Sequence, residues 1–170
     1  MLQLTEIQEL VIGDATDYSE GENNERHIYI FNSGDEDNLD TSFTAIIFAD
    51  NPEEINIYSK NESDLLKIAL DVRKGINTFY DTDGKVMGYF DENELTILDD
   101  KKESLMTFKG EEMAFMDAHE VPFALVNDEI ENEITEKYFS LPHMTIELID
   151  PEENNIYRNL VVASIITLTL

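Results

Sequence analysis

Residues 76–108, INTFYDTDGKVMGYFDENELTILDDKKESLMTF, contain four short apolar runs separated by polar turns. The four runs, each of strand length, are 76–80, 86–90, 95–98 and 104–108. The turn between the first two contains Gly84, which reaches positive φ at no steric cost, and the last two flank the polar turn 99–102. These residues therefore predict two successive hairpins in an antiparallel meander.

Similar short apolar segments lie on both sides of the meander, bounded by polar residues that favour turns. The additional strands expected from them are 27–31, 43–48, 55–58, 121–126, 144–149 and 160–170. Residues 160–170 are rich in β-branched side chains and too short to span a bilayer, which favours a buried strand. Residues 1–12 fit either a strand or a short amphipathic helix. The chain shows no obvious internal repeat.

The period of the apolar residues changes in 61–75, NESDLLKIALDVRKG, which predicts a helix near 62–74. Asn61 or Ser63 is placed to cap its first turn, and Gly75 follows its last turn. One apolar stripe is expected from Leu65, Ile68, Ala69 and Val72.

A second helix, rich in acidic residues, is expected near 128–139, with Asn127 as its cap. Residues 111–119 are compatible with a further short helix. The expected fold class is α+β, a mainly antiparallel sheet of about eight or nine strands with helices near 62–74 and 128–139. At 170 residues, the chain is expected to form a single acidic globular domain over 1–170.

The net charge is the most unusual property of the chain. It has 38 acidic and 11 basic residues and a net charge of −27, far more than solubility requires. Residues 1–59, 60–109 and 110–170 carry −13, −3 and −11. A domain of this size is about 40 Å across, and 40 Å of duplex DNA carries roughly 24 charges. The charge of the protein therefore matches that of a duplex segment of its own size.

Composition also indicates a compartment and excludes some partners. The absence of cysteine fits a reducing compartment, and the first residues lack the features of a secretory signal. We therefore expect a cytoplasmic protein, in a host cell if it is phage-encoded. An acidic surface repels nucleic acid and anionic membranes, so neither is an expected partner.

No motif in the chain identifies a reaction, a cofactor or a metal. Nucleotide-binding glycine loops, a G-x-S-x-G elbow and a His-Glu-x-x-His pair are all missing. Asp81, Asp83 and Glu92 have the spacing of calcium ligands, but Lys85 occupies another ligand position, so a hairpin turn explains them better. We expect no enzyme activity, no cofactor and no metal site, with His27, His119 and His143 in ordinary hydrogen bonds.

The candidate partner-binding surface is built from acidic side chains on the expected second helix and in two expected loops. On the helix, Glu129, Glu133 and Glu136 lie one turn apart, about 6 and 4.5 Å along the axis, which is near the phosphate spacing of one DNA strand. The other members are Asp128 and Glu131 on the helix, Asp17, Glu20 and Glu22 in the first loop, and Asp35, Glu36, Asp37 and Asp40 in the second. The alternative is an ordinary solvated face.

These observations favour an acidic inhibitor that mimics the charge of nucleic acid and occupies the basic groove of a nucleic-acid-binding protein, such as a nuclease or a restriction or CRISPR effector. In composition, the chain resembles the acidic anti-restriction proteins, anti-CRISPR proteins and glycosylase inhibitors of bacteriophages, which share charge rather than sequence. The alternatives are a β-rich structural subunit whose strands, such as 160–170, join identical neighbours in a homo-oligomer, and a small enzyme or ligand-binding domain that uses carboxylates or a divalent cation.

Overall fold

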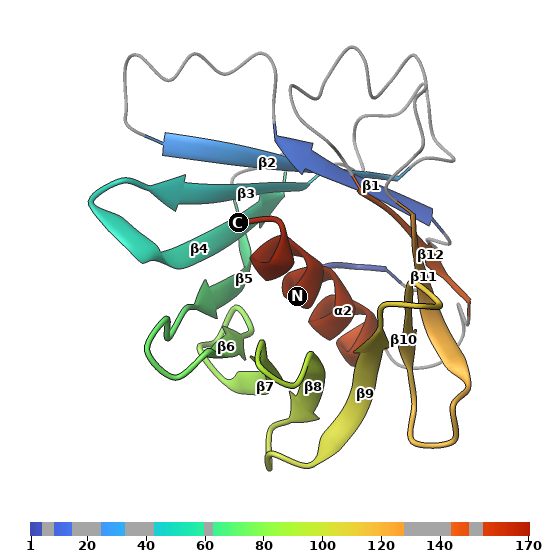
Figure 1. The fold of residues 1–170 in the computed structure, drawn as a ribbon. Helices are drawn as coiled ribbons and strands as arrows, with labels where there is room; N and C mark the ends of the chain where they lie inside the picture. The colour runs from blue at the N-terminus through green and yellow to red at the C-terminus, as the bar shows by residue number, and fades with distance from the viewer. Residues whose placement is uncertain (5–8, 15–24, 33–42, 60–62, 128–143, 150–154) are drawn as a thin grey trace.

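The computed structural model describes residues 1–4, 9–14, 25–32, 43–59, 63–127, 144–149 and 155–170. Within these residues, twelve antiparallel strands close into a barrel around one helix, α2 (Figure 1). Neighbours in sequence are neighbours in the barrel from β1 to β12, and β1 pairs with β12 to close it. The mainly antiparallel character is thus confirmed, whereas the expected sheet of eight or nine strands is wrong.

The strands are short, from three to nine residues, and are joined mostly by tight turns in the β3–β11 region. Their bounds are β1 Glu9–Asp14, β2 Glu25–Asn32, β3 Phe43–Phe48, β4 Asn51–Ser59, β5 Asp64–Ala69, β6 Ile76–Tyr80, β7 Val86–Asp91, β8 Thr96–Asp99, β9 Ser104–Lys109, β10 Ala114–Met116, β11 Pro122–Asn127 and β12 Met144–Leu148. The two hairpins of the predicted meander are β6–β7 and β8–β9, which are confirmed.

Alternation along the strands places one set of side chains inside the barrel. In β4, Ile55 and Ile57 are fully buried, whereas Asn56 between them is half-buried. Phe79, Phe90 and Phe115 come from other parts of the wall and join the same core. A closed barrel has no free strand edge, so every strand of the wall has a neighbour on both sides.

The helix α2, Asn155–Leu168, passes through the middle of the barrel (Figure 1). Every residue from Arg158 to Thr167 is buried, so the interior is filled by the chain itself. Residues 160–170 were expected to form a strand, and this expectation is wrong. A strand at the centre of a closed barrel has no neighbour with which to pair, whereas a helix satisfies its own backbone N–H and C=O groups.

The polar side chains of α2 are buried with hydrogen bonds to backbone. The Ser164 and Thr167 hydroxyls donate to the carbonyls of Leu160 and Ser164 on the preceding turn, both at 2.7 Å. Short hydroxyl side chains can therefore face the core without a partner in the wall. This arrangement lets a helix with polar residues lie in an apolar interior.

The N-terminal residues run beside the first turns of α2 and are hydrogen-bonded to its side chains. The Asn159 amide accepts from the Leu2 N–H at 2.8 Å and donates to the Leu2 carbonyl at 2.9 Å, and Asn155 accepts from the Leu4 N–H at 2.8 Å. The fully buried Arg158 guanidinium donates to the Leu4 carbonyl. Side-chain amides thus replace the strand neighbour that this segment lacks, while Leu2 and Leu4 complete the core.

Close packing of α2 against β7 explains a glycine in the wall. A Cβ atom on Gly88 would lie 2.9 Å from Leu160 and 2.5 Å from the Leu98 carbonyl oxygen. Any larger residue would force the helix or β8 to move. Gly88 therefore fixes how near α2 lies to the sheet.

The helix expected near 62–74 is wrong. Residues 64–69 form β5, paired with β4 on one side and β6 on the other, and the following residues form a turn. The expected stripe does not exist, because Val72 is 76% exposed. Gly75, taken as the residue after a helix, has a φ of 68° in a turn in which the Asp71 carboxylate accepts from the Lys74 N–H at 3.1 Å.

The short helix considered for 111–119 is also wrong, because these residues form a turn and β10. The acidic helix near 128–139 lies outside the described residues. Residues 1–12, for which a strand and a helix were both open, end in β1. In the part of the chain that the structure describes, no helix has the length and apolar character needed to cross a membrane.

Candidate functional site

The barrel has two ends, which we name after one residue at each. Asp14, Glu25, Asn127 and Met144 lie at the Asp14 end, as shown by the pairing of Ile12 with Met144 and of Thr145 with Asn127. The helix α2 begins at the opposite end, the Asn155 end. It finishes at the Asp14 end, where the Arg26 guanidinium donates to the Thr169 carbonyl at 3.3 Å.

All twelve acidic residues of the predicted partner-binding surface lie outside the described residues. Their anchor points on the barrel are nevertheless described. Segments 15–24 and 128–143 both leave the barrel at the Asp14 end, from the adjacent strands β1, β2, β11 and β12. Segment 33–42 joins β2 to β3 at the other end. The topology therefore brings the attachment points of 128–143 and 15–24 together, and places those of 33–42 about 20 Å away.

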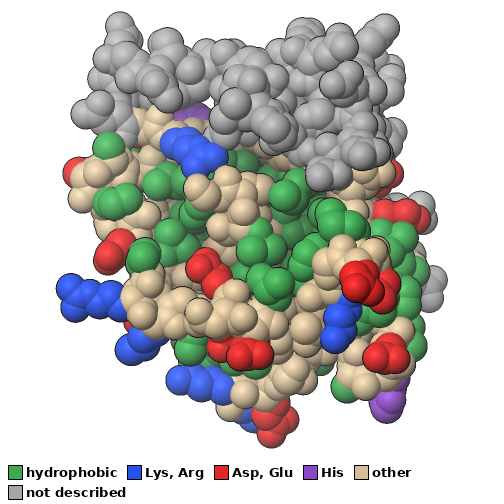
Figure 2. All heavy atoms as spheres, viewed as in Figure 1, with side chains coloured by type: hydrophobic (Ala, Val, Ile, Leu, Met, Phe, Trp, Pro, Cys, Tyr) green, Lys and Arg blue, Asp and Glu red, His purple; other side chains and the backbone are tan. Residues whose placement is uncertain are grey.

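Charge is unevenly divided between the described barrel and the remaining 48 residues. The barrel residues carry 21 acids and 9 bases, whereas the remainder carries 17 acids and 2 bases. On the face in Figure 2, hydrophobic side chains occupy the middle, and acidic and basic side chains are interspersed around them. The described acids on this face do not form a continuous band.

Three successive turns at the Asn155 end share one geometry. They begin at Asp81, Asp99 and Asp117, and in each the Asp Oδ1 atom accepts from the backbone N–H groups two and four residues later, at 2.8–3.0 Å. In each, the residue three positions after the Asp has positive φ, namely Gly84, Lys102 and Glu120. The hairpin turn expected at 81–85 is confirmed.

In the third of these turns, the hydrogen bonds stabilise the charged form of the Asp117 carboxylate. The hydrogen bond from the Val121 N–H is the main reason why the pKa of Asp117 is below its usual value. Desolvation opposes this shift, and the His119 N–H bond and the charge of the His119 side chain add to it. The bond from the Lys74 N–H lowers the pKa of Asp71 at the opposite end of the barrel in the same way. These carboxylates are therefore structural anions that hold turns.

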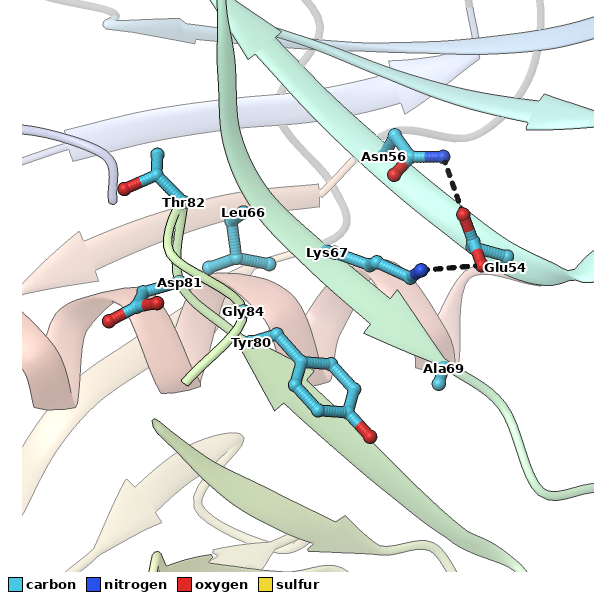
Figure 3. Close-up of a pocket in the computed structure, with 9 residues that line it drawn as sticks. All are labelled: Glu54, Asn56, Leu66, Lys67, Ala69, Tyr80, Asp81, Thr82 and Gly84. Atoms are coloured by element: carbon cyan, nitrogen blue, oxygen red, sulfur yellow. Dashed lines mark hydrogen bonds and ion pairs between the residues drawn. The ribbon is translucent and has the colours of Figure 1, made fainter. Parts of the chain in front are cut away.

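A shallow hollow of about 370 Å³ lies on the outer wall where β5 and β6 diverge (Figure 3). The two strands pair through three residue pairs only, from Lys67 and Tyr80 to Ala69 and Thr78. Leu66 lies at the back of the hollow, with Thr82 and Gly84 of the β6–β7 turn along one side.

Two charged groups of this hollow, Lys67 and Glu54, neutralise each other. The Lys67 Nζ atom lies 2.7 Å from Glu54 Oε2, and the Asn56 amide donates to Glu54 Oε1 at 3.3 Å. The hydrogen bond from Lys67 is the main reason why the pKa of Glu54 is below its ordinary value. Lys67 and Glu54 are therefore paired with each other, while the Asp81 carboxylate also lines the hollow.

The histidines also provide no metal centre in the described residues. His27 Nε2 lies 3.0 Å from Glu25 Oε2, as expected for a histidine in an ordinary hydrogen bond. His119 is exposed in the third Asp turn, and His143 lies outside the described ranges. Among the described side chains, no group of three or more His, Asp or Glu is arranged to hold a metal ion.

Comparison with known proteins found no match to any family model, curated protein or solved structure.

Sequence reasoning missed the repetition of the Asp turns, although a signal was present. The spacing is 18 residues from Asp81 to Asp99 and again from Asp99 to Asp117. This is the length of two consecutive strands together with their two turns. The neighbours of these aspartates differ completely, as DTDGK, DDKKE and DAHEV show, so only the aspartate and the backbone geometry repeat. The initial finding of no internal repeat is corrected to this extent.

Proposed function

We propose that this chain is an acidic binding protein that blocks the basic groove of a nucleic-acid-binding protein, with the Asp14 end as its binding end. The observation that carries the proposal is the net charge of −27 on 170 residues. A charge of this size destabilises the folded state by self-repulsion, so a partner that neutralises it provides a functional reason for its presence.

The topology supports the choice of the Asp14 end. Segments 15–24 and 128–143, which contain eight of the predicted partner-binding acids, are attached to neighbouring strands there. Lysine and arginine side chains that normally contact phosphates would contact these carboxylates, with an association rate that falls as salt rises.

The structural-subunit alternative loses the strand that it gave as its example. Residues 160–170 lie largely in the buried helix α2 and are not a strand available to identical neighbours. The barrel is closed, so its wall offers no free strand edge for pairing between copies.

The test is a pull-down with the whole protein from a bacterial lysate, in about 50 mM and about 500 mM salt, followed by a nucleic-acid-binding assay of what is captured. We expect stoichiometric capture of a basic nucleic-acid-binding protein at low salt and release at high salt. Replacing Glu129, Glu133 and Glu136 by Gln should weaken inhibition at least about tenfold.

The matched control removes the same three charges from the other end of the barrel, as Asp83→Asn, Glu103→Gln and Glu120→Gln, all on exposed turn residues. It should change inhibition less than about twofold, because charges beyond a Debye length of about 8–10 Å are screened. Capture of no nucleic-acid-binding protein would contradict the proposal. Equal losses in the two triple variants would show that no localised acidic surface is used.

A further inference from the structure

A hollow of about 240 Å³ opens at the Asn155 end, where the β6–β7 and β8–β9 turns meet the first residues of α2. Met87, Leu105, Ile156 and Leu160 provide apolar lining, which we call the floor of the hollow. Ile156 is 41% exposed, so apolar surface is open to solvent here. The volume is below the roughly 300 Å³ at which pockets for drug-sized ligands begin, which suits a small or narrow occupant.

The same hollow is lined by charged groups, which we call its rim. These are three carboxylates, Asp81, Asp99 and Asp100, and one ammonium, Lys85. Even if the α-ammonium of Met1, which also lines it, is counted, the lining stays negative. Asp81 and Asp99 each use one oxygen to hold their own turn. The second oxygen of each, and the whole carboxylate of Asp100, make no hydrogen bond or ion pair within the part of the chain that the structure describes.

We propose that this hollow binds an aliphatic chain that ends in a cation, an alkylammonium or an alkylguanidinium. The apolar stem lies on Met87, Leu105 and Ile156, and the cationic head reaches the carboxylates of Asp99 and Asp100 at the rim. An anion is repelled by the rim, and a purely apolar ligand leaves the carboxylates without a partner while covering them from water. The proposal concerns the opposite end from the partner surface proposed above and does not depend on it.

The first experiment follows the methyl resonances of the whole protein during titration with n-butylguanidinium. We expect shifts concentrated on Met87, Leu105 and Ile156, and binding at least about fivefold tighter than that of guanidinium or n-butanol, because only the combined ligand uses both floor and rim. Equal affinity for the three probes, or shifts spread over the barrel, would overturn the proposal.

A matched pair of variants tests the rim. Asp100→Asn removes one charge without touching a turn hydrogen bond and should weaken n-butylguanidinium binding at least about threefold. Asp83→Asn removes the same charge from an exposed position in the neighbouring turn that does not line the hollow, and should change binding less than about 1.5-fold. Equal effects of the two substitutions would mean that only overall charge attracts the probe, which contradicts a site.

The same titration separates the two sources of such a cation. A blocked arginine amide represents a side chain of a partner protein, and 1,4-diaminobutane represents a free amine. Tighter binding of the arginine amide would support a protein side chain as the occupant, and tighter binding of the diamine would support a free metabolite. If neither produces shifts at Met87 and Ile156, the proposal is wrong.

Discussion

β5 and α2 both contribute apolar side chains to the barrel core, but their backbone N–H and C=O groups find hydrogen-bond partners in different places. β5 lies in the wall, hydrogen-bonded to β4 and β6, with Leu66 and Ile68 inside and Lys67 outside. α2 lies at the centre and forms its backbone hydrogen bonds within the helix. It is buried on all sides from Arg158 to Thr167. Position relative to the closed wall therefore selects the secondary structure, and a change at the centre should disturb more contacts than a change in the wall.

The largest effect is expected from Arg158→Ala in α2. The substitution leaves a cavity in the core and the Leu4 carbonyl without its donor, so the free energy of unfolding should fall by about 3–5 kcal/mol. The matched control is Arg73→Ala in the exposed turn after β5, which should cost less than about 0.5 kcal/mol. Urea unfolding curves provide both values. If Arg158→Ala lowered the free energy of unfolding as little as Arg73→Ala, the N-terminal segment and α2 would not be joined as described.

A smaller effect is expected where α2 meets the wall at Gly88. Gly88→Ala places a Cβ atom against Leu160 and the Leu98 carbonyl and should cost about 1–3 kcal/mol. In a Leu160→Ala background, part of that cost should disappear, because the leucine methyl groups are no longer in the way. The double-mutant cycle, measured by thermal or urea unfolding, gives the coupling directly.

Gly75→Ala is the control for the cycle. It also strains the backbone, at a φ of 68°, but in a turn far from Leu160. Its cost should be the same in both backgrounds. If the costs of Gly88→Ala and Leu160→Ala were also additive, α2 would not pack against β7 as described.

The smallest effect is expected from Lys67→Met on the outer face of β5. The Lys67–Glu54 pair is partly exposed, so its loss should cost less than about 1 kcal/mol at pH 7. The folded-state pKa of Glu54 lies below its unfolded value of 4.5, so this stability is present above pH 4.5 and is lost as the pH falls through the folded pKa. The stability difference between wild type and variant should therefore disappear on acidification. A stability difference between wild type and variant that grows as the pH falls would contradict a stabilising Lys67–Glu54 pair.

Much of the wall could be predicted from sequence, for local reasons. β2, β3 and β6–β9 are short apolar runs between turn residues, and Asp-Thr-Asp-Gly-Lys specifies a hairpin without help from distant residues. The total of twelve strands was missed because β1, β5 and β10 carry no distinctive alternation.

Two of the elements assigned to the wrong structure, residues 62–74 and 160–170, fail for one reason. Residues 64–75 combine helix formers with acids at the start and a glycine at the end, which equally suit a strand followed by a turn at Gly75. α2 is rich in Val and Ile and has no polar face, because it is surrounded by apolar wall on all sides. Closure of the barrel decides both, and closure is a property of the whole chain.

For the candidate sites, the sequence yielded charge but not position. The acids of 15–24 and 128–143 are visible in the sequence, yet only the pairing of β1 with β12 brings their attachment points to one end. The hollow at the Asn155 end combines residues from three distant parts of the chain, such as Asp99, Met87 and Ile156. No local pattern indicates it.

Both proposals place binding outside the barrel, because α2 occupies the interior. Native-state hydrogen exchange tests this most directly. We predict that the amides of Leu160 to Ile166 exchange only through global unfolding, with the same free energy as the most protected amides of β6 and β7, while Val72 and Arg73 exchange quickly. If the α2 amides exchange through a separate opening of much lower free energy, the helix leaves the barrel readily, and the interior itself becomes the binding site.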